Sequence, residues 1–202
     1  MNSRRHSRSS LLVDYGATTG VKHPMLIHGA GITAVAAACT SAANALTLSV
    51  IMLLLCSGVA MVYIFERGEY VYPMLGVIYF TVSSFGACVC ATAVNFLSPG
   101  TAASLGMYLP LLAADPIVLA RIQPDSPFVS PSDALPSAVG LWWMFAVMAL
   151  PIGIIREILG KGTLFGLPLF FNPDVGGMSL PFAGLIMLGF GMALYNRNAD
   201  EV

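Results

Sequence analysis

The sequence predicts an all-α integral membrane protein with six transmembrane segments, arranged as two inverted three-segment repeats. Only 9 % of its 202 residues are charged and 57 % are hydrophobic, whereas a soluble domain carries roughly 25 % charged residues. The stretches Leu46–Phe65 and Leu135–Ile155 each run for about 20 residues without a charge, enough to cross a bilayer core of ~30 Å. The first segment of each half is, in addition, short or interrupted.

Both ends of the chain are expected to be polar tails. Residues 1–22 are rich in Ser and Arg, and their apolar stretch Leu11–Val13 is too short for the roughly 7–15-residue core of a secretory signal. Residues 197–202 form the second tail. Of the nine Lys and Arg residues, only Arg156 and Lys161 fall on the far side of a six-segment topology. The positive-inside rule therefore predicts that both termini lie in the cytoplasm.

The first repeat, residues 23–97, opens with a short Gly- and Ala-rich segment at about Met25–Ala38. The second segment, about Ser41–Phe65, follows almost without a loop and carries Asn, Thr and Ser side chains that bond neighbouring helices in membranes. The third segment, about Pro73–Phe96, is rich in Gly, Ala and Ser, which let helix backbones approach closely.

The fourth segment, Leu105–Arg121, is predicted to be broken in its middle. Pro110 and Pro116 each lack an N–H and clash with the preceding helical turn. Asp115 precedes a proline and is pushed toward extended backbone. Non-helical backbone at membrane depth is tolerated only where protein or a water-filled cavity satisfies its polar groups. We therefore expect this break to face something inside the protein.

The second repeat, residues 98–196, contains this broken segment and two further segments at about Ala134–Gly160 and Leu180–Tyr195. An odd number of segments per half inverts the second half relative to the first. Paired short or Gly/Pro-interrupted segments at corresponding positions indicate an inverted repeat with its functional site near the bilayer midplane. The alternative is that one interruption is a simple kink and the other a short helix.

The cysteines leave two roles open. Cys39, Cys56, Cys88 and Cys90 all lie in apolar segments, where they are either packing residues or ligands. Side chains two positions apart point to different faces of a helix, so Cys88 and Cys90 make a poor chelating pair. The sequence shows no basic patch with interleaved aromatic residues, which would have indicated a nucleic acid partner.

Two adjacent charges, Arg156 and Glu157, close the fifth segment. They are either a paired anchor at the membrane interface or part of an ion entrance on the non-cytoplasmic side. Their position at the end of a segment favours the anchor.

Three stretches of the chain resemble one family of membrane subunits. The run Ile155–Phe165, IREILGKGTLF, resembles its arginine-glutamate-isoleucine and glycine-threonine-leucine-phenylalanine signature. Ser104–Leu111, SLGMYLPL, is similar to the opening of its fourth segment, and Thr40–Leu46, TSAANAL, to that of its second. The family comprises the A and E subunits of the Rnf complex and the D and E subunits of the sodium-translocating NADH:quinone reductase (Nqr). The resemblance covers the chain after about Lys22 and is closest to the E subunit of Rnf and the D subunit of Nqr.

The resemblance implies a bacterial inner-membrane protein whose half-helices meet at mid-membrane. It implies pairing with a homologous membrane subunit of opposite topology and a 2Fe–2S cluster shared by the pair, with two cysteine ligands from each. Flavin-bearing and iron–sulfur subunits would complete a complex that moves electrons across the bilayer, coupled to sodium or proton movement. Such a subunit is not catalytic alone. A stand-alone inverted-repeat secondary transporter, or a structural subunit without a cofactor, is the alternative.

The chain departs from the family at the two cluster cysteines. Their positions correspond here to Thr33 and Pro116, and neither side chain supplies a thiolate to iron. One explanation is that the cluster is absent. Another is that Cys39 replaces one ligand, with Cys88 or Cys90 as a second. The remaining explanations are a shifted alignment or ligation by the partner alone.

Asp115 stands beside one of these positions and has two open roles. An ionisable group at membrane depth is costly and usually lies on a pathway or in a pair. The same side chain is also suited to cap the second half-helix by accepting its free N–H groups. The sequence leaves both roles open.

Overall fold

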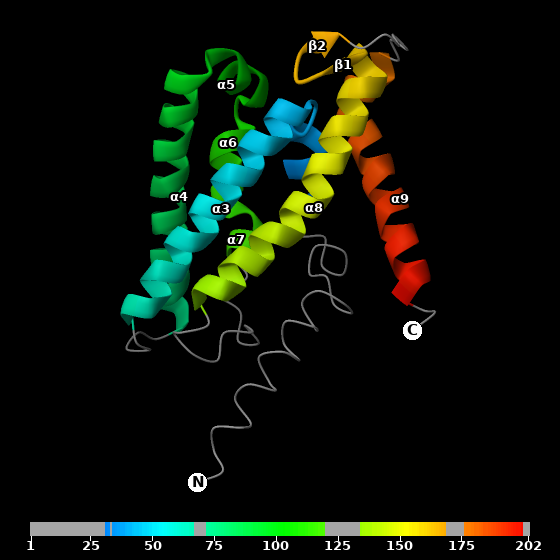
Figure 1. Ribbon diagram of the computed structural model, residues 1–202. Coiled ribbons are helices and arrows are strands. Elements are labelled where there is room, and N and C mark those ends of the chain that lie inside the picture. The colour runs from blue at the N-terminus through cyan, green and yellow to red at the C-terminus, as the bar shows by residue number, and fades with distance from the viewer. Residues whose placement is uncertain (1–30, 33, 67–71, 120–133, 169–175, 200–202) are drawn as a thin grey trace.

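The computed structural model describes residues 31–32, 34–66, 72–119, 134–168 and 176–199, which are mostly helical (Figure 1). The elements are, in order, the π-helix η1 (Ala34–Ala38), α3 (Ala42–Glu66), α4 (Tyr72–Leu97), α5 (Pro99–Leu105), α6 (Tyr108–Leu111), the 3-10 helix η2 (Leu112–Ala114), α7 (Pro116–Leu119), α8 (Ala134–Lys161), β1 (Thr163–Leu164), β2 (Leu167–Pro168), the 3-10 helix η5 (Gly176–Ser179) and α9 (Pro181–Ala199).

Among the described residues, three helical stretches are long and apolar enough to cross a membrane: Ala42–Phe65, Gly76–Leu97 and Ala134–Lys161. The bent segment α5–α7 is a fourth if it counts as one span, and α9 contains a shorter apolar helix, Pro181–Gly191. The chain is therefore a multi-pass membrane protein. The predicted second, third and fifth segments agree with α3, α4 and α8 to within one residue at each end. Most of the predicted first segment, Met25–Ala38, lies outside the described residues.

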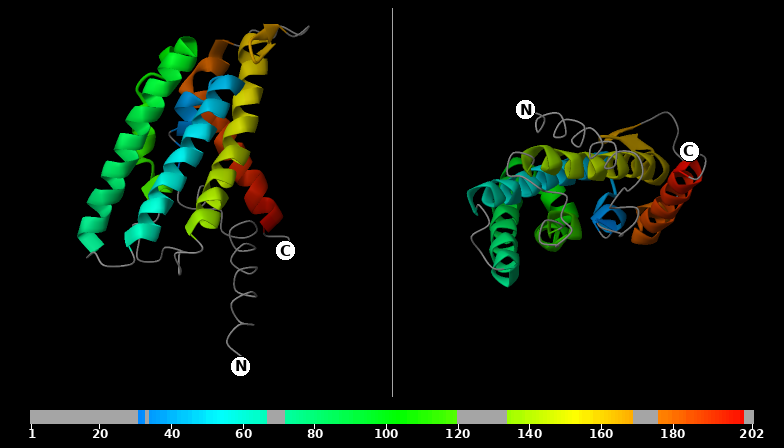
Figure 2. Two further views of the ribbon diagram at one scale, coloured as in Figure 1. Left: turned by 60° about the vertical axis from the view of Figure 1, so that its left-hand side comes forward. Right: turned by 90° about the horizontal axis from the view of Figure 1, so that it is seen from below.

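The helices form two layers (Figure 2). α3 and α8 cross in close contact, and α4, the α5–α7 segment, η1 and α9 line up against them. Gly153 makes the crossing close, because a Cβ there would lie 2.6 Å from the Ala45 Cβ and 3.0 Å from the Ser41 carbonyl oxygen. Small residues serve this purpose in membrane helices. The two broken segments, η1 and α5–α7, therefore lie side by side in the middle of the second layer.

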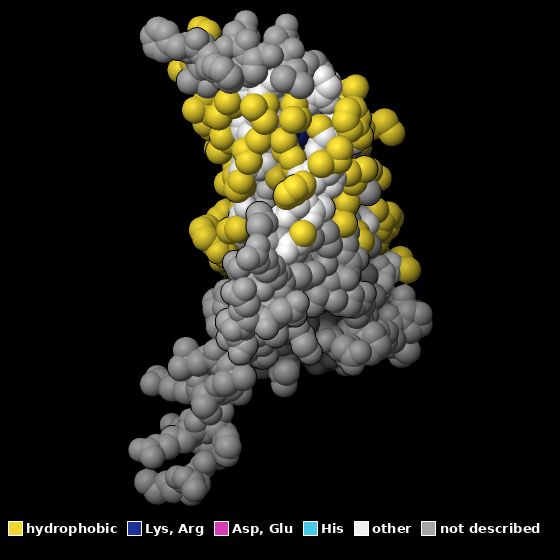
Figure 3. Space-filling view, turned by 90° about the vertical axis from the view of Figure 1, so that its right-hand side faces the viewer, with side chains coloured by type: hydrophobic (Ala, Val, Ile, Leu, Met, Phe, Trp, Pro, Cys, Tyr) yellow, Lys and Arg dark blue, Asp and Glu magenta, His cyan; other side chains and the backbone are white. Residues whose placement is uncertain are grey.

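The core lies between the two layers and the outside is apolar as well. Leu48 and Met52 of α3 and Phe145 of α8 have no exposed surface. On the outside, Phe96 is 89 % exposed, and hydrophobic side chains cover most of the described surface on the α9 side (Figure 3). A helical bundle that is apolar on both its inner and outer faces is suited to lipid.

The fourth segment is broken as predicted, but its sharpest break comes before the prolines. α5 and the stretch Tyr108–Val118 meet at 66°, and Gly106 between them has a φ of 47°, which favours glycine. Because α6 begins after this break, Pro110 lies in a first turn, where its missing N–H had no helical partner. The backbone is interrupted again at Asp115, which is extended, with a ψ of 132°, before Pro116. We call this interruption the second break.

A two-stranded hairpin that the sequence did not predict follows α8. β1 and β2 pair antiparallel, with Thr163 opposite Pro168. Both turn residues have positive φ, 51° at Phe165 and 78° at Gly166, as in the tight turns that match the twist of antiparallel strands. The hairpin therefore lies at the end of a membrane-spanning helix.

Candidate functional site

The chain is interrupted between η1 and α3, and we call this interruption the first break. Arg156 of α8 stabilises it. Arg156 is only 1 % exposed. Its Nη1 atom donates to the carbonyl oxygens of Ala36 at 2.7 Å and of Cys39 at 3.1 Å. Its Nε and Nη2 atoms donate to the carbonyl oxygens of Met178 and Leu180, both at 3.0 Å. The guanidinium therefore ties the end of η1 to the turn that precedes α9.

The next residue of α8, Glu157, holds the other side of the same break and is 2 % exposed. Its Oε2 atom accepts a hydrogen bond from the backbone nitrogen of Ala42, the first residue of α3, at 2.7 Å. Its Oε1 atom accepts from the backbone nitrogen of Gly166 at 2.9 Å and from the Thr163 hydroxyl at 3.2 Å. One carboxylate thus joins the start of α3 to the hairpin.

Arg156 and Glu157 together form what we call the Arg–Glu clamp. The positive charge lies at the carbonyls that end η1, and the negative charge lies at the N–H that begins α3. These signs complement the partial charges of helix ends, and the hydrogen bonds offset the cost of burying both charges. The interfacial anchor favoured on the sequence is wrong, because both side chains are buried and bonded to the broken segment.

The second break is stabilised by Asp115 and by Ser83 of α4. Asp115 is 4 % exposed, its Oδ1 atom accepts from the backbone nitrogen of Ile117 at 2.9 Å, and its carbonyl oxygen accepts from that of Val118 at 3.0 Å. These are the bonds of a cap at the start of α7. The Ser83 hydroxyl donates to the carbonyl oxygen of Ala113 at 2.9 Å. The capping role of Asp115 is therefore confirmed.

Side-chain hydrogen bonds connect the first break to α5. Asn44 of α3 is 4 % exposed and donates through Nδ2 to the Thr40 hydroxyl at 3.0 Å. Its Oδ1 atom accepts from the Ser104 hydroxyl at 2.9 Å. Thr40 lies in the first break, and Ser104 lies in α5, two positions before Gly106. Asn44 therefore links the first break to α5, close to the bend at Gly106.

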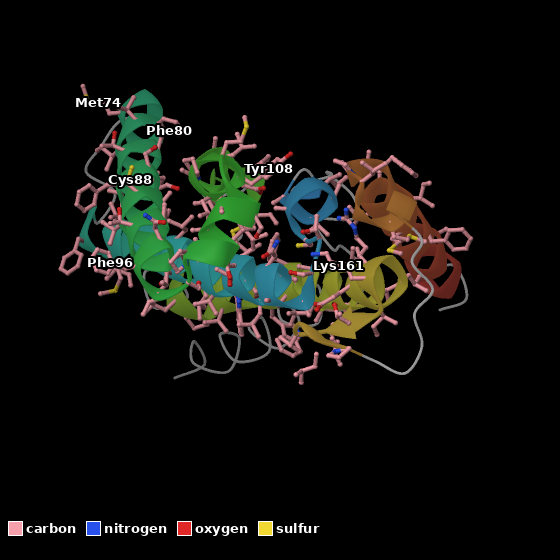
Figure 4. All side chains as sticks on the ribbon, turned by 90° about the horizontal axis from the view of Figure 1, so that it is seen from above. Met74, Phe80, Cys88, Phe96, Tyr108 and Lys161 are labelled. Carbon is pink, nitrogen blue, oxygen red and sulfur yellow. The ribbon has the colours of Figure 1, made fainter. Side chains whose placement is uncertain are left out.

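One side of the broken fourth segment is open. We define its outer face by six exposed residues between the bend and α7: Gly106, Met107, Pro110, Leu111, Ala114 and Pro116. Figure 4 shows the α5–α7 segment beside η1, with the labelled Tyr108 on the side away from α3 and α8. Irregular backbone at membrane depth does not occur against lipid. An outer face at that depth would need protein or water against it.

A family model described as "Rnf-Nqr subunit, membrane protein" matches residues 17–193 of the chain. The chain belongs to the Rnf–Nqr membrane subunit family. This agrees with the resemblance that the motifs in the sequence indicated.

Three curated relatives are named as E subunits of oxidoreductase complexes. The chain is 31 % identical over 150 residues to the E subunit of the ion-translocating oxidoreductase complex of Vibrio cholerae, covering 71 % of this chain and 62 % of the relative. It is 36 % identical over 101 residues to the E subunit of the Na(+)-translocating ferredoxin:NAD(+) oxidoreductase complex of Acetobacterium woodii, covering 48 % and 51 %. It is 34 % identical over 107 residues to the E subunit of the proton-translocating ferredoxin:NAD(+) oxidoreductase complex of Clostridium ljungdahlii, covering 48 % of each chain. The chain thus spans about half the length of the latter two relatives.

The structure separates the site residues that the sequence predicted for this Rnf–Nqr member. Thr33 lies outside the described residues. Pro116 is exposed at the first position of α7, whereas Asp115 before it is buried. Cys39 lies in the first break, and its side chain has no exposed surface. Cys39 and Pro116 therefore belong to neighbouring breaks but face different surroundings.

The described residues do not fit a 2Fe–2S cluster of the kind that the family resemblance implies. All four cysteines of the chain are described, and Cys39 and Cys56 are buried. Cys88 is exposed and Cys90 is half-buried, both on α4. In the described part of the chain, no three His, Cys, Asp or Glu side chains gather in a way that could hold a metal ion, so no metal site is complete within these residues alone.

The sequence did not reveal the partners of the Arg–Glu clamp or the bridge from Asn44 to Ser104. The clamp residues contact backbone more than 100 positions away, at separations of 115 for Glu157 to Ala42 and 120 for Arg156 to Ala36. The signal in the sequence was the position of both charges in an apolar segment, where charges are usually paired or functional.

Proposed function

We propose that this chain is a membrane subunit of an ion-translocating electron-transport complex of the Rnf type. It works only when paired with a homologous membrane subunit of opposite topology. The observation that best supports this proposal is the outer face, because broken backbone inside a bilayer cannot face lipid. Its exposed residues include Met107, at 76 %, and Leu111, at 49 %. A membrane partner would cover this surface and complete the path between the two chains.

The names of the relatives support the proposal. Each relative is an E subunit of an oxidoreductase complex, named for sodium in Acetobacterium woodii and for protons in Clostridium ljungdahlii. For this chain we propose the shared part of these names, ion translocation coupled to oxidoreduction, with flavin-bearing and iron–sulfur subunits completing the complex. The ion is either sodium or a proton.

The proposed topology has six spans in a bacterial inner membrane, with both termini in the cytoplasm. Residues 23–97 and 98–196 would form the inverted repeats. The order of elements supports this arrangement, since η1, α3 and α4 correspond to α5–α7, α8 and α9 as a broken segment, a long crossing helix and an outer helix.

We propose in addition that Asp115 lies on the ion path. Its carboxylate is buried beside the outer face, and among the described residues only Oδ1 has a hydrogen bond, to Ile117. The Oδ2 atom is thus left for a cation or a proton. Ionisable groups at membrane depth usually serve such a path.

Replacing Leu111 of the outer face tests the pairing. Leu111→Gln should abolish co-purification of partner membrane subunits with the tagged chain, because an unsatisfied amide would enter the interface. The matched control is Val147→Gln, since Val147 is 45 % exposed on α8, in the other layer. Co-purification that survives Leu111→Gln, or a purified chain that transports ions alone in liposomes, would favour the stand-alone transporter instead.

A further inference from the structure

We infer that this chain contributes no thiolate to iron, and that its side of the pairing surface is closed by apolar packing of Pro116, Leu111 and Met107. The inference rests on the proposed pairing and concerns the same outer face. A cluster shared by two chains must be reached from the surface of each. The question is therefore whether any cysteine of this chain reaches that surface.

Cys39 does not reach it. Its side chain has no exposed surface and belongs to the apolar core. Its carbonyl oxygen is bound by Arg156, which also binds Ala36 in the last turn of η1. Exposing the thiol would require the break to rotate and these bonds to open. The Arg–Glu clamp thus holds Cys39 in the interior.

Of the other three cysteines, Cys88 is exposed and Cys90 is half-buried, but none of the three lies on the α5–α7 segment that carries the outer face. Cys56 is 1 % exposed and lies on α3, in the layer behind the broken segments. Cys88 and Cys90 lie on α4, and two positions along a helix turn side chains by about 200°. A single cluster therefore cannot take both thiols from α4.

At the second break, the position that the family resemblance assigns to a cluster cysteine is Pro116, and the residue before it is a helix cap. Asp115 turns inward and accepts the Ile117 N–H, while Pro116 presents an exposed ring on the outer face. Both breaks are thus organised by hydrogen bonds within the chain and need no metal to hold them. The apolar outer face is suited to close packing against a partner helix.

The test uses the complex purified through this chain, with all four cysteines replaced by alanine. Iron per complex and the low-temperature EPR signal of the iron–sulfur centres should equal those of the wild-type complex. Loss of about two iron atoms per complex, as one 2Fe–2S cluster would give, would overturn the inference. The single variants Cys39→Ala and Cys88→Ala provide the same comparison if the fourfold variant does not assemble, and loss of iron in either one decides against it.

A second measurement tests the packing of Pro116. In the cysteine-free chain, Pro116→Cys should react with a maleimide when the chain is purified alone and be protected in the complex. Equal labelling in both states would contradict packing of this residue against a partner. Failure of the wild-type chain to co-purify with any membrane subunit would instead contradict the proposed function, so the two failures are distinguishable.

Discussion

The Oε2 atom of Glu157 lies 2.7 Å from the backbone nitrogen of Ala42, across 115 positions of the chain. The same side chain holds Gly166 through its other oxygen. The Glu157 carboxylate thus links the first residue of α3 to the β1–β2 hairpin. The start of α3 therefore depends on a residue of α8.

Replacing Glu157 should destabilise the protein strongly. Glu157→Ala leaves the Ala42 and Gly166 N–H groups without their acceptor, at a cost of about 1–3 kcal/mol for a buried unsatisfied group. Glu157→Gln should lower stability by less than Glu157→Ala does. Its amide oxygen can still accept one hydrogen bond, but its amide nitrogen is a donor that would face another donor. Thermal unfolding in detergent micelles measures both. Lys161→Ala, at an exposed position of the same helix, should change little, and an equal loss there would contradict the role of the clamp.

Arg156→Lys should behave almost like a deletion of the side chain. An ammonium is a compact donor, whereas the guanidinium fork reaches four carbonyl oxygens on η1, η5 and their flanking turns. We expect faster amide hydrogen exchange in η1 and in the first turn of α9. Unchanged exchange in both elements would show that the four bonds are dispensable.

Two glycines of α9 differ in the space around them, and this difference tests how closely α9 packs against η1. A Cβ at Gly184 would lie 2.5 Å from the Ala36 carbonyl oxygen, whereas a Cβ at Gly189 on the same helix meets nothing within 4 Å. Gly184→Ala should therefore lower thermal stability by several degrees, since backbone must move. Gly189→Ala should be neutral or slightly stabilising. The reverse order of the two variants would contradict the close approach of α9 to η1.

Relieving the turn of the hairpin should stabilise the chain. Phe165 has a φ of 51°, a region that costs a side-chain residue about 1 kcal/mol. Phe165→Gly should raise the unfolding temperature, and Phe165→Asn should do so by less. A fall in stability would mean that the Phe165 ring makes contacts worth more than the strain.

Asp115→Asn separates the two roles of this residue. Asparagine caps a helix as well as aspartate does, so the complex should assemble with unchanged stability. Ion-coupled activity should fall, because the neutral amide neither binds a cation electrostatically nor carries a proton. Ion uptake by inverted vesicles measures the coupling, and full uptake in the variant would leave Asp115 with its capping role alone.

The long helices could be predicted because length and apolarity alone define them. α3, α4 and α8 begin and end where charged or turn-forming residues interrupt apolar stretches, as lipid requires. The break in the fourth segment was predicted from Pro110 and Pro116, yet its sharpest bend occurs at Gly106. A proline is harmless once the helix restarts just before it, and glycine provides the φ that the bend needs.

The candidate site was predicted only in part. Asp115 was singled out because it precedes a proline in the broken segment. Cys39 was named as a substitute ligand near Thr33, and the structure buries its side chain in the core. The clamp was missed, because Arg156 and Glu157 act on backbone that the chain brings near only after folding. The Asn44–Ser104 contact likewise joins residues 60 positions apart, which no periodicity reveals.

The dependence of α3 on α8 has a consequence for synthesis in the cell. The ribosome makes Ala42 long before Glu157, so the first half enters the membrane with carbonyls of η1 and the first N–H of α3 still unbonded. These groups cannot be left to lipid. We therefore expect a chain truncated before α8 to be less stable in the membrane than the full chain, because the acceptor of the Ala42 N–H and the donor to the Ala36 carbonyl both lie on α8. The part of the chain that is made first thus reaches its final bonding only when a later helix has been made.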